Sequence, residues 1–390
     1  MSETEAEDRP LLLGIDLGVA RTAVVSNRGA RHLLDSVVGY PRDIIALKTL
    51  GAPQIFGARA LEHKAALTLY HPLGDGTIAQ DRRRDYNAAG ELLRHVIELA
   101  TNSAPPRANV TDHGVHGVSG HGGPQAAASE TAMRTSVPEP ARSPLSAVPR
   151  DRLRVSGVIA VPATFGAGGR QTLATIAGEL LADFLIIEQP LPVAYYLGRL
   201  DNSLLIDIGA GSISLCPCRG RLPNPNERVT LPKGGDSLDQ RLQALISQRY
   251  PEVQITRELA RQIKEEHAHV GTSPRPVLVT LRAAGKPRQY ELSEELRLVC
   301  QGLVPEIAEK LAAIIHEFDP EDLDEVLQNI YLTGGGAQIH GLDTALADAL
   351  ADYGQVRIKI LDDPEYAGAL GALRLAEELP PQRWHDSGFT

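Results

Sequence analysis

Two short segments of this sequence place an aspartate and a glycine directly after an apolar run. The first is Gly14-Ile15-Asp16-Leu17-Gly18, and the second, near the middle of the chain, is Asp207-Ile208-Gly209-Ala210-Gly211. A strand that ends in Asp and continues into a glycine turn lets backbone N–H groups approach phosphate oxygens while the carboxylate holds a hydrated Mg²⁺. Two copies of this arrangement predict two similar halves that face one phosphate ligand.

Two further glycine segments follow in a fixed order. Gly234-Gly235-Asp236-Ser237-Leu238-Asp239 comes soon after the second aspartate, and Leu332-Thr333-Gly334-Gly335-Gly336 comes late in the chain. A single Asp-x-Gly segment is commonly an ordinary hairpin turn. Both copies, followed by the late triple glycine, favour a nucleotide site over that simpler interpretation.

The order of these segments resembles that of the actin-like ATPase superfamily. Segments 36–41, 72–76, 362–364 and 371–381 resemble bacterial actins of the MreB kind and, among them, the filament proteins that align magnetosomes. The resemblance covers nearly the whole chain except residues 101–150. It implies an α/β, actin-like ATPase fold, with two lobes that are each built on a ribonuclease-H-like sheet and carry small insertion subdomains.

The resemblance also implies roles for single residues toward two cofactors, ATP and Mg²⁺. Asp16 and Asp207 match the two aspartates that hold the Mg²⁺ shell, and Glu188 matches the glutamate that orients the attacking water; these three are the expected catalytic residues. Lys264 matches a lysine near the ribose and base. The remaining positions match turns around the phosphates or the wall under adenine: Gly18, Val19, Ala20, Arg21, Gly209, Ala210, Gly211, Ser212, Gly235, Gly334, Gly335, Gly336 and Ala337.

The sequence departs from the family pattern beside the phosphates. The family usually has Thr after the first glycine, where this chain has Val19 and then Ala20. The second turn usually continues Gly-Thr-Thr and an acidic residue, where this chain has Gly211-Ser212-Ile213-Ser214. Hydrogen bonds to a charged group contribute roughly 1.5–3 kcal/mol each. We therefore expect a weaker or slower ATPase, with Arg21 as an added cation near the phosphates.

Composition limits the remaining interpretations. A length of 390 residues fits two domains or lobes, and a hydrophobic content of 43% is typical of a globular protein. The net charge of −10 argues against nucleic acid as a main partner. Three cysteines, Cys216, Cys218 and Cys300, do not make a disulfide framework and fit a reducing cytoplasm. No apolar run reaches the ~18–20 residues that span a bilayer.

We expect lobe I to occupy residues 10–192. An acidic tail, residues 1–9, precedes it and resembles neither a signal peptide nor a membrane-inserting helix, so no direct membrane insertion is expected. Lobe I contains a small insertion subdomain at about 33–84. It also contains a segment at about 101–150 that is rich in Pro, Gly and Ser, which predicts a disordered loop.

Lobe II is expected over residues 193–376, with a small insertion subdomain at about 234–292. Residues 362–379 return to lobe I, and residues 380–390 form a C-terminal tail. The apolar pattern also predicts one long amphipathic helix over 293–317, interrupted at Pro305.

The expected function is that of an ATP-dependent filament-forming bacterial actin. It would be a cytoplasmic, cytoskeletal ATPase whose partner is the chain itself, in a homopolymer, with protein adaptors on an intracellular organelle such as a magnetosome. A nucleotide-binding regulator with degenerate ATPase stays open because of Val19 and Ile213. A small-molecule kinase would need an aspartate base and a larger sugar-binding insertion, neither of which is evident. A chaperone of the DnaK type would need a C-terminal substrate domain.

Overall fold

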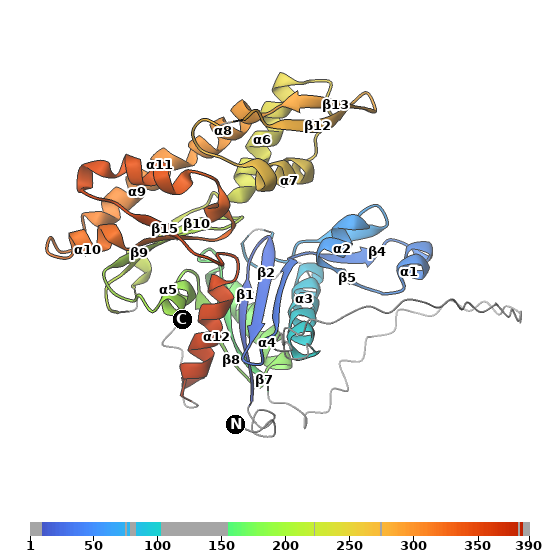
Figure 1. Cartoon of the computed structure of the whole chain (residues 1–390). Coiled ribbons are helices and arrows are strands. Elements are labelled where there is room, and N and C mark those ends of the chain that lie inside the picture. Colours follow the sequence, from blue (N-terminus) through green and yellow to red (C-terminus); the bar gives the residue numbers. More distant parts are fainter. Residues whose placement is uncertain are drawn as a thin grey trace, which may run out of the picture.

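The protein is described by a computed structural model, which covers residues 10–102 without 75 and 79–82, and residues 155–384 without 222, 274 and 381–382. The predicted acidic tail, nearly all of the predicted loop at 101–150 and most of the predicted C-terminal tail lie outside the described residues. Two five-stranded sheets form the centre of the molecule (Figure 1). We call the halves that surround them lobe I and lobe II.

The two sheets follow one plan. Lobe I contains β1 (Leu11–Leu17), β2 (Arg21–Ser26), β3 (Arg31–Asp35), β7 (Val155–Val161) and β8 (Asp183–Glu188). Lobe II contains β9 (Ser203–Ile208), β10 (Ile213–Cys218), β11 (Val229–Leu231), β14 (Ile330–Thr333) and β15 (Ile358–Ile360). The orders are β3-β2-β1-β7-β8 and β11-β10-β9-β14-β15. The central strand of each sheet has one antiparallel and one parallel neighbour: β1 pairs antiparallel with β2 and parallel with β7, and β9 pairs antiparallel with β10 and parallel with β14. This is the repetition that the two aspartate segments predicted.

Helices cover the outer face of each sheet. In lobe I, α3 (Arg83–Asn102) and α4 (Gly166–Leu180) pack on the face to which β1 contributes the buried side chains of Leu11, Leu13, Ile15 and Leu17. In lobe II, the corresponding core lies under α6 (Gly235–Arg249), α7 (Arg257–His267), α8 (Ser293–Gln301), α9 (Leu303–Ile315), α10 (Leu323–Gln328) and α11 (Leu342–Ala349). The alternation of apolar residues along β1 is what a half-covered strand requires.

Two helices join the lobes. Helix α5 (Leu191–Leu197) packs on the lobe II sheet, and α12 (Ala367–Glu378) packs on β1 and β7 of lobe I. The two helices lie against each other so closely that a Cβ built on Gly371 would stand 1.6 Å from the carbonyl oxygen of Pro192. Gly14 meets α12 in the same way, because its Cβ would stand 2.0 Å from the carbonyl oxygen of Ala369. Only glycine permits these contacts.

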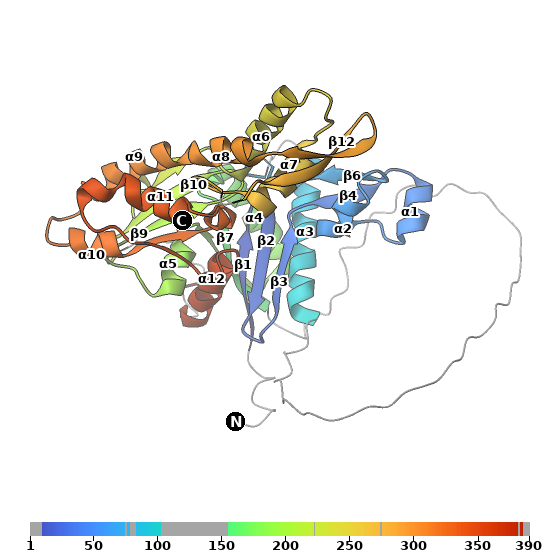
Figure 2. The same ribbon diagram turned by 45° about the horizontal axis from the view of Figure 1, so that its top comes forward.

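Each lobe carries a smaller group of elements. In lobe I they are β4 (Val38–Pro41), α1 (Ile44–Leu50), β5 (Ile55–Phe56), α2 (Gly57–Glu62) and β6 (Leu67–Tyr70), and in lobe II the hairpin of β12 (Leu278–Ala283) and β13 (Lys286–Glu291), beside α6 and α7. Both groups lie on the same side of the molecule, opposite α10 (Figures 1 and 2). They fall inside the ranges predicted for the two insertions, and the domain bounds themselves remain our interpretation.

The single long helix predicted over 293–317 is wrong. Two helices, α8 and α9, occupy this range, and the break is at Gly302 rather than at Pro305. Pro305 lies in the first turn of α9, where a missing backbone N–H costs no intrahelical hydrogen bond.

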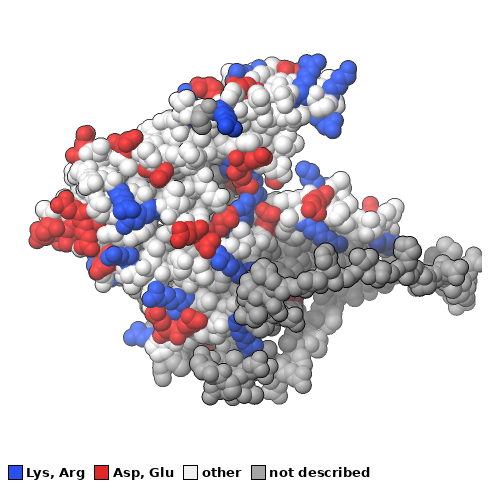
Figure 3. Space-filling model, in the orientation of Figure 1, with Lys and Arg blue, Asp and Glu red and all other residues white. Residues whose placement is uncertain are grey.

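Charge is unevenly spread over lobe II. The β12–β13 hairpin exposes Arg282, Lys286 and Arg288, whereas α10 and the turn before it expose Glu321, Asp324 and other acidic side chains (Figure 3). The two groups stand at opposite ends of the lobe. Among the described residues, no helix combines the length and the apolar character that a membrane crossing requires.

Candidate functional site

A cleft lies between the lobes, at the ends of the central strands β1 and β9. It is lined by residues from both lobes, and they include the following members of the predicted set: Asp16, Gly18, Val19, Ala20, Arg21, Asp207, Gly209, Ala210, Gly211, Ser212, Gly235, Lys264, Gly334, Gly335 and Gly336. Two predicted residues do not line it. Ala337 is 1% exposed and belongs to the lobe II core, and Glu188 lies beside the cleft wall.

The two aspartate turns have the same backbone geometry. Each closes a tight antiparallel hairpin, in which the N–H of Gly18 donates to the carbonyl oxygen of Arg21 at 3.1 Å and that of Gly209 to the carbonyl oxygen of Ser212 at 2.9 Å. The two turns approach each other across the cleft, since a Cβ built on Gly211 would lie 3.2 Å from Cγ2 of Val19. The turns therefore form two facing walls of one site.

Asp16 and Asp207 are partly buried carboxylates that line the cleft. Burial and the charge of Asp207 raise the pKa of Asp16 to about 8. A hydrogen bond from Gln189 acts in the opposite direction and lowers this pKa. Burial raises the pKa of Asp207 to about 6. Neither forms an ion pair with any described residue, and two facing carboxylates of this kind fit a divalent cation with oxygen ligands.

Both aspartates are backed by glycines. A Cβ on Gly368, in α12, would stand 2.2 Å from Oδ2 of Asp16, and one on Gly334 would stand 2.5 Å from Oδ1 of Asp207. Gly334 also has a φ of 78°, which favours glycine. Gly336 lacks room for a side chain because its Cβ would stand 2.1 Å from Cγ2 of Ile208. The late triple glycine thus has a packing role beside the second aspartate.

Glu188 was expected to orient the attacking water, but Gln189 and not Glu188 lines the cleft. Glu188 ends β8, and its carboxylate forms ion pairs with Arg170 and Arg228. Gln189 lines the cleft, and its side-chain amide donates to Oδ1 of Asp16. Successive side chains at a strand end point to opposite sides, so a shift of one residue exchanges the two environments.

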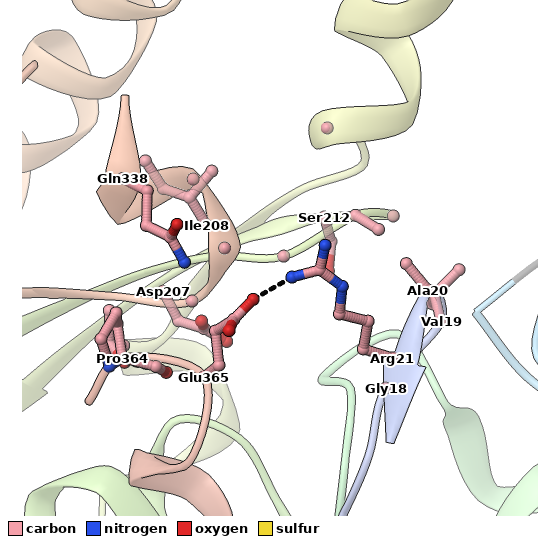
Figure 4. A pocket seen from close by; sticks show the side chains of 18 of the residues that line it. Gly18, Val19, Ala20, Arg21, Asp207, Ile208, Ser212, Gln338, Pro364 and Glu365 are labelled. Atoms are coloured by element: carbon pink, nitrogen blue, oxygen red, sulfur yellow. Dashed lines mark hydrogen bonds and ion pairs between the residues drawn. The ribbon is translucent and has the colours of Figure 1, made fainter. Parts of the chain in front are cut away.

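Ion pairs span the mouth of the cleft (Figure 4). Arg21 of lobe I pairs with Glu365, in the loop before α12, and with Glu265 of α7, where Nη2 to Oε2 is 3.0 Å. Arg261 of α7 pairs with Asp35 of β3 at 3.2 Å. The guanidinium of Arg21, expected near the phosphates, is thus held by two carboxylates.

Lys264 lies deeper, where its Nζ is 2.6 Å from Oδ1 of Asp239 and donates to the carbonyl oxygen of Gly235 at 2.9 Å. This lysine therefore ties α7 to the N-terminal turn of α6. Sequence reasoning missed Gln189, Glu365, Gln338 and Ile339 as lining residues. Gln338 and Ile339 stand two and three residues after the triple glycine, and Glu365 directly follows the segment 362–364, so the sequence offered a signal near each of them.

Comparison with known proteins agrees with the predicted family. The MreB/Mbl protein family model matches residues 156–382. The actin-like protein MamK of Magnetospirillum gryphiswaldense is 36% identical over 389 residues, which is 100% of this chain and 95% of that protein.

Solved structures of MamK show the same fold. A MamK double helical filament matches with a TM-score of 0.80 and 35% identity, over 95% of this chain and 100% of that chain. A non-polymerising MamK mutant bound to AMPPNP matches with a TM-score of 0.65 and 34% identity, over 95% and 99%. The predicted actin-like fold is confirmed, and the chain belongs to the MreB/Mbl family of bacterial actins, with MamK proteins among its relatives.

Proposed function

We propose that this protein binds ATP with Mg²⁺ between its lobes, hydrolyses it and assembles into filaments. The observation that carries the proposal is the pair of aspartate turns, which face each other across one cleft and come from two lobes of the same plan. Phosphoryl transfer depends on neutralising phosphate charge and aligning a water molecule. A site divided between two lobes makes both depend on how the lobes close.

The residues of the cleft divide naturally between the parts of the nucleotide. Asp16 and Asp207 would hold the Mg²⁺ shell, and the bound ion would neutralise phosphate charge. The amides of the two turns would face the phosphates, with Gly235 close to the second turn. Lys264 and the wall of Gly334–Gly336 would lie by the ribose and base. A MamK relative bound to AMPPNP supports the binding of a nucleotide by this chain.

Gln189 is the residue that we assign to the attacking water. It lines the cleft and bonds Asp16, whereas the carboxylate of Glu188 is occupied by two arginines. An amide can position water by accepting and donating hydrogen bonds but takes no proton. Positioning suffices for a slow hydrolysis that has little covalent character.

The proposed filament is a homopolymer of this chain. MamK forms a double helical filament, and two features of this chain favour contacts between copies. The ends of lobe II carry opposite charges, which suits head-to-tail assembly. Ile44 and Ile45 of α1 are 64% and 72% exposed at the tip of the lobe I insertion. We propose that the filament is cytoplasmic and, through protein adaptors, aligns or positions an intracellular structure such as a magnetosome.

The test uses purified full-length protein. With ATP and Mg²⁺ it should release phosphate, scatter light and form filaments visible by electron microscopy, and Gln189→Ala should assemble but release phosphate about 100-fold more slowly, because the water is no longer positioned. Filaments without phosphate release in the wild type would favour the second candidate, a nucleotide-binding regulator. Val19 and Ala20 favour that candidate, because they place no hydroxyl in the lobe I turn. A protein that neither binds nucleotide nor assembles would refute both candidate functions.

A further inference from the structure

Glu188 joins the two lobes behind the cleft. One carboxylate oxygen pairs with Arg170, in α4 of lobe I, and the other with Arg228, directly before β11 of lobe II. The side chains of Glu188, Arg170 and Arg228 are only 13%, 20% and 19% exposed. Shielding from solvent strengthens the attraction between such charges, and removal of one member leaves a poorly solvated charge without compensation, which is costly.

Without Glu188, two positive charges of this triad would face each other with no negative charge between them. Burial and the neighbouring charge of Arg228 lower the pKa of Arg170, so the two guanidinium groups oppose each other. One carboxylate placed between them converts this repulsion into attraction. Since the arginines belong to different lobes, the repulsion acts directly on the separation of the lobes.

The triad is connected to both aspartate turns. Toward lobe I, the next residue is Gln189, whose N–H donates to the carbonyl oxygen of Val161 at 2.8 Å and whose amide bonds Asp16. Toward lobe II, β11 leads from Arg228 to Gly235, whose N–H donates to the carbonyl oxygen of Gly209 at 3.0 Å. A displacement of the triad would therefore be transmitted to Asp16 and to the lobe II turn.

We propose that Glu188 is a positioning residue, which holds the lobes together on the far side of Gln189 and so fixes the place of the attacking water. It does not touch the nucleotide. The inference rests on the proposed function, namely that ATP is hydrolysed between the lobes. It also explains why an acidic residue stands beside a glutamine at this strand end.

The main test is Glu188→Gln, which keeps the size of the side chain and removes its charge. Turnover of ATP should fall about 10- to 100-fold, the size expected for a misplacement on the order of 1 Å, while the affinity for AMPPNP falls less than about threefold. Glu179→Gln is the matched control, because Glu179 is an exposed glutamate on α4. The control should behave as wild type.

A second substitution separates positioning from catalysis. Arg228→Gln added to Glu188→Gln removes the repulsion, so turnover should recover severalfold, in a double-mutant cycle that is far from additive. A residue that acted on water itself would not be rescued by the loss of an arginine. Arg228→Gln alone keeps the pair of Glu188 with Arg170 but loses the bridge, and it should slow turnover even if Glu188→Gln fails to fold.

The failures of the two proposals are distinguishable. Wild-type turnover in Glu188→Gln, or a double variant as slow as the single one, would overturn the positioning role and leave the ATPase intact. A wild-type protein that binds AMPPNP but releases no phosphate would refute hydrolysis, and the positioning role with it.

Discussion

The two aspartate turns share a backbone but differ in what surrounds them. The lobe I turn is backed by main chain and by a side chain, because Ser36 donates from its N–H to the carbonyl oxygen of Ala20 at 2.8 Å and from Oγ to that of Gly18 at 2.7 Å. The lobe II turn is backed by main chain, because the N–H groups of Gly235 and Asp236 donate to the carbonyl oxygens of Gly209 and Ala210 at 3.0 and 2.9 Å. A backbone contact is fixed by the fold, whereas a hydroxyl contact depends on one residue.

The turns also differ at their tips. Lobe I presents Val19 and Ala20, and lobe II presents Ser212, so only the lobe II turn carries a hydroxyl at its tip. Asp16 titrates higher than Asp207 and has a hydrogen-bond partner, Gln189. The repeated hairpin therefore supplies the common frame, and the lobes differ around it, with lobe I carrying the residue that we propose positions the water.

The largest expected effect is the loss of either aspartate. Asp16→Ala or Asp207→Ala should abolish Mg²⁺-dependent ATP binding, because one carboxylate cannot replace two in holding the ion's shell. Circular dichroism should remain that of the wild type. Asp348→Ala, an exposed aspartate of α11, is the control and should bind normally. Unchanged ATP affinity in Asp207→Ala would mean that the lobe II turn is not part of the Mg²⁺–ATP site, and the two turns could then not be compared as halves of one site.

The repeated frame was predictable from the sequence because its signals are local. An apolar run, an aspartate and a glycine turn specify a hairpin wherever they occur. The exchange of Glu188 for Gln189 was not predictable, since both are polar and the difference is one residue at a strand end. Contacts between distant segments, such as that of Gly368 in α12 with Asp16, were not predictable either, because no periodicity links residues that far apart in the chain.

Gly368→Ala should disturb lobe I without removing a charged group. The new Cβ would stand 2.2 Å from Oδ2 of Asp16, so the carboxylate or α12 must move. We expect turnover to fall about 100-fold with a smaller loss of ATP affinity, as for a misplacement on the order of 1 Å. Gly178→Ala in α4 is the matched control, because its Cβ would meet only Phe184 at 3.8 Å, and thermal stability should be unchanged or higher. Normal turnover in Gly368→Ala would mean that the position of Asp16 is not critical.

The pH dependence of stability should separate the two carboxylates. In nucleotide-free protein with EDTA, Asp16 keeps its proton up to about pH 8, whereas in the unfolded chain its pKa is 3.8. The folded state then binds more protons than the unfolded state, so the free energy of unfolding falls as pH rises through this window and levels off above it. Asp16→Asn should flatten the thermal-melting profile between pH 6 and about 8.

Asp207→Asn should remove mainly the slope below about pH 6, together with the part of the Asp16 shift that the charge of Asp207 causes. A wild-type melting temperature that rises from pH 6 to about 8 would contradict the assignment of a high pKa to Asp16.

The smallest effect is the addition of a hydroxyl to each turn, and it is expected on one side only. Val19 is half-buried and lines the cleft, so in Val19→Thr the new hydroxyl can reach a phosphate or water, and ATP should bind roughly tenfold more tightly, from about 1.5 kcal/mol. Ile213 also stands where the family has Thr, but it is 1% exposed in the lobe II core. Ile213→Thr should leave ATP affinity unchanged and cost about 1–3 kcal/mol of stability, since a hydroxyl without a partner is buried. Calorimetric titration with AMPPNP and thermal melts measure both. Tighter ATP binding in Ile213→Thr, or unchanged affinity in Val19→Thr, would contradict this prediction. It would mean that the direction in which these side chains lie does not decide whether an added hydroxyl reaches the ligand.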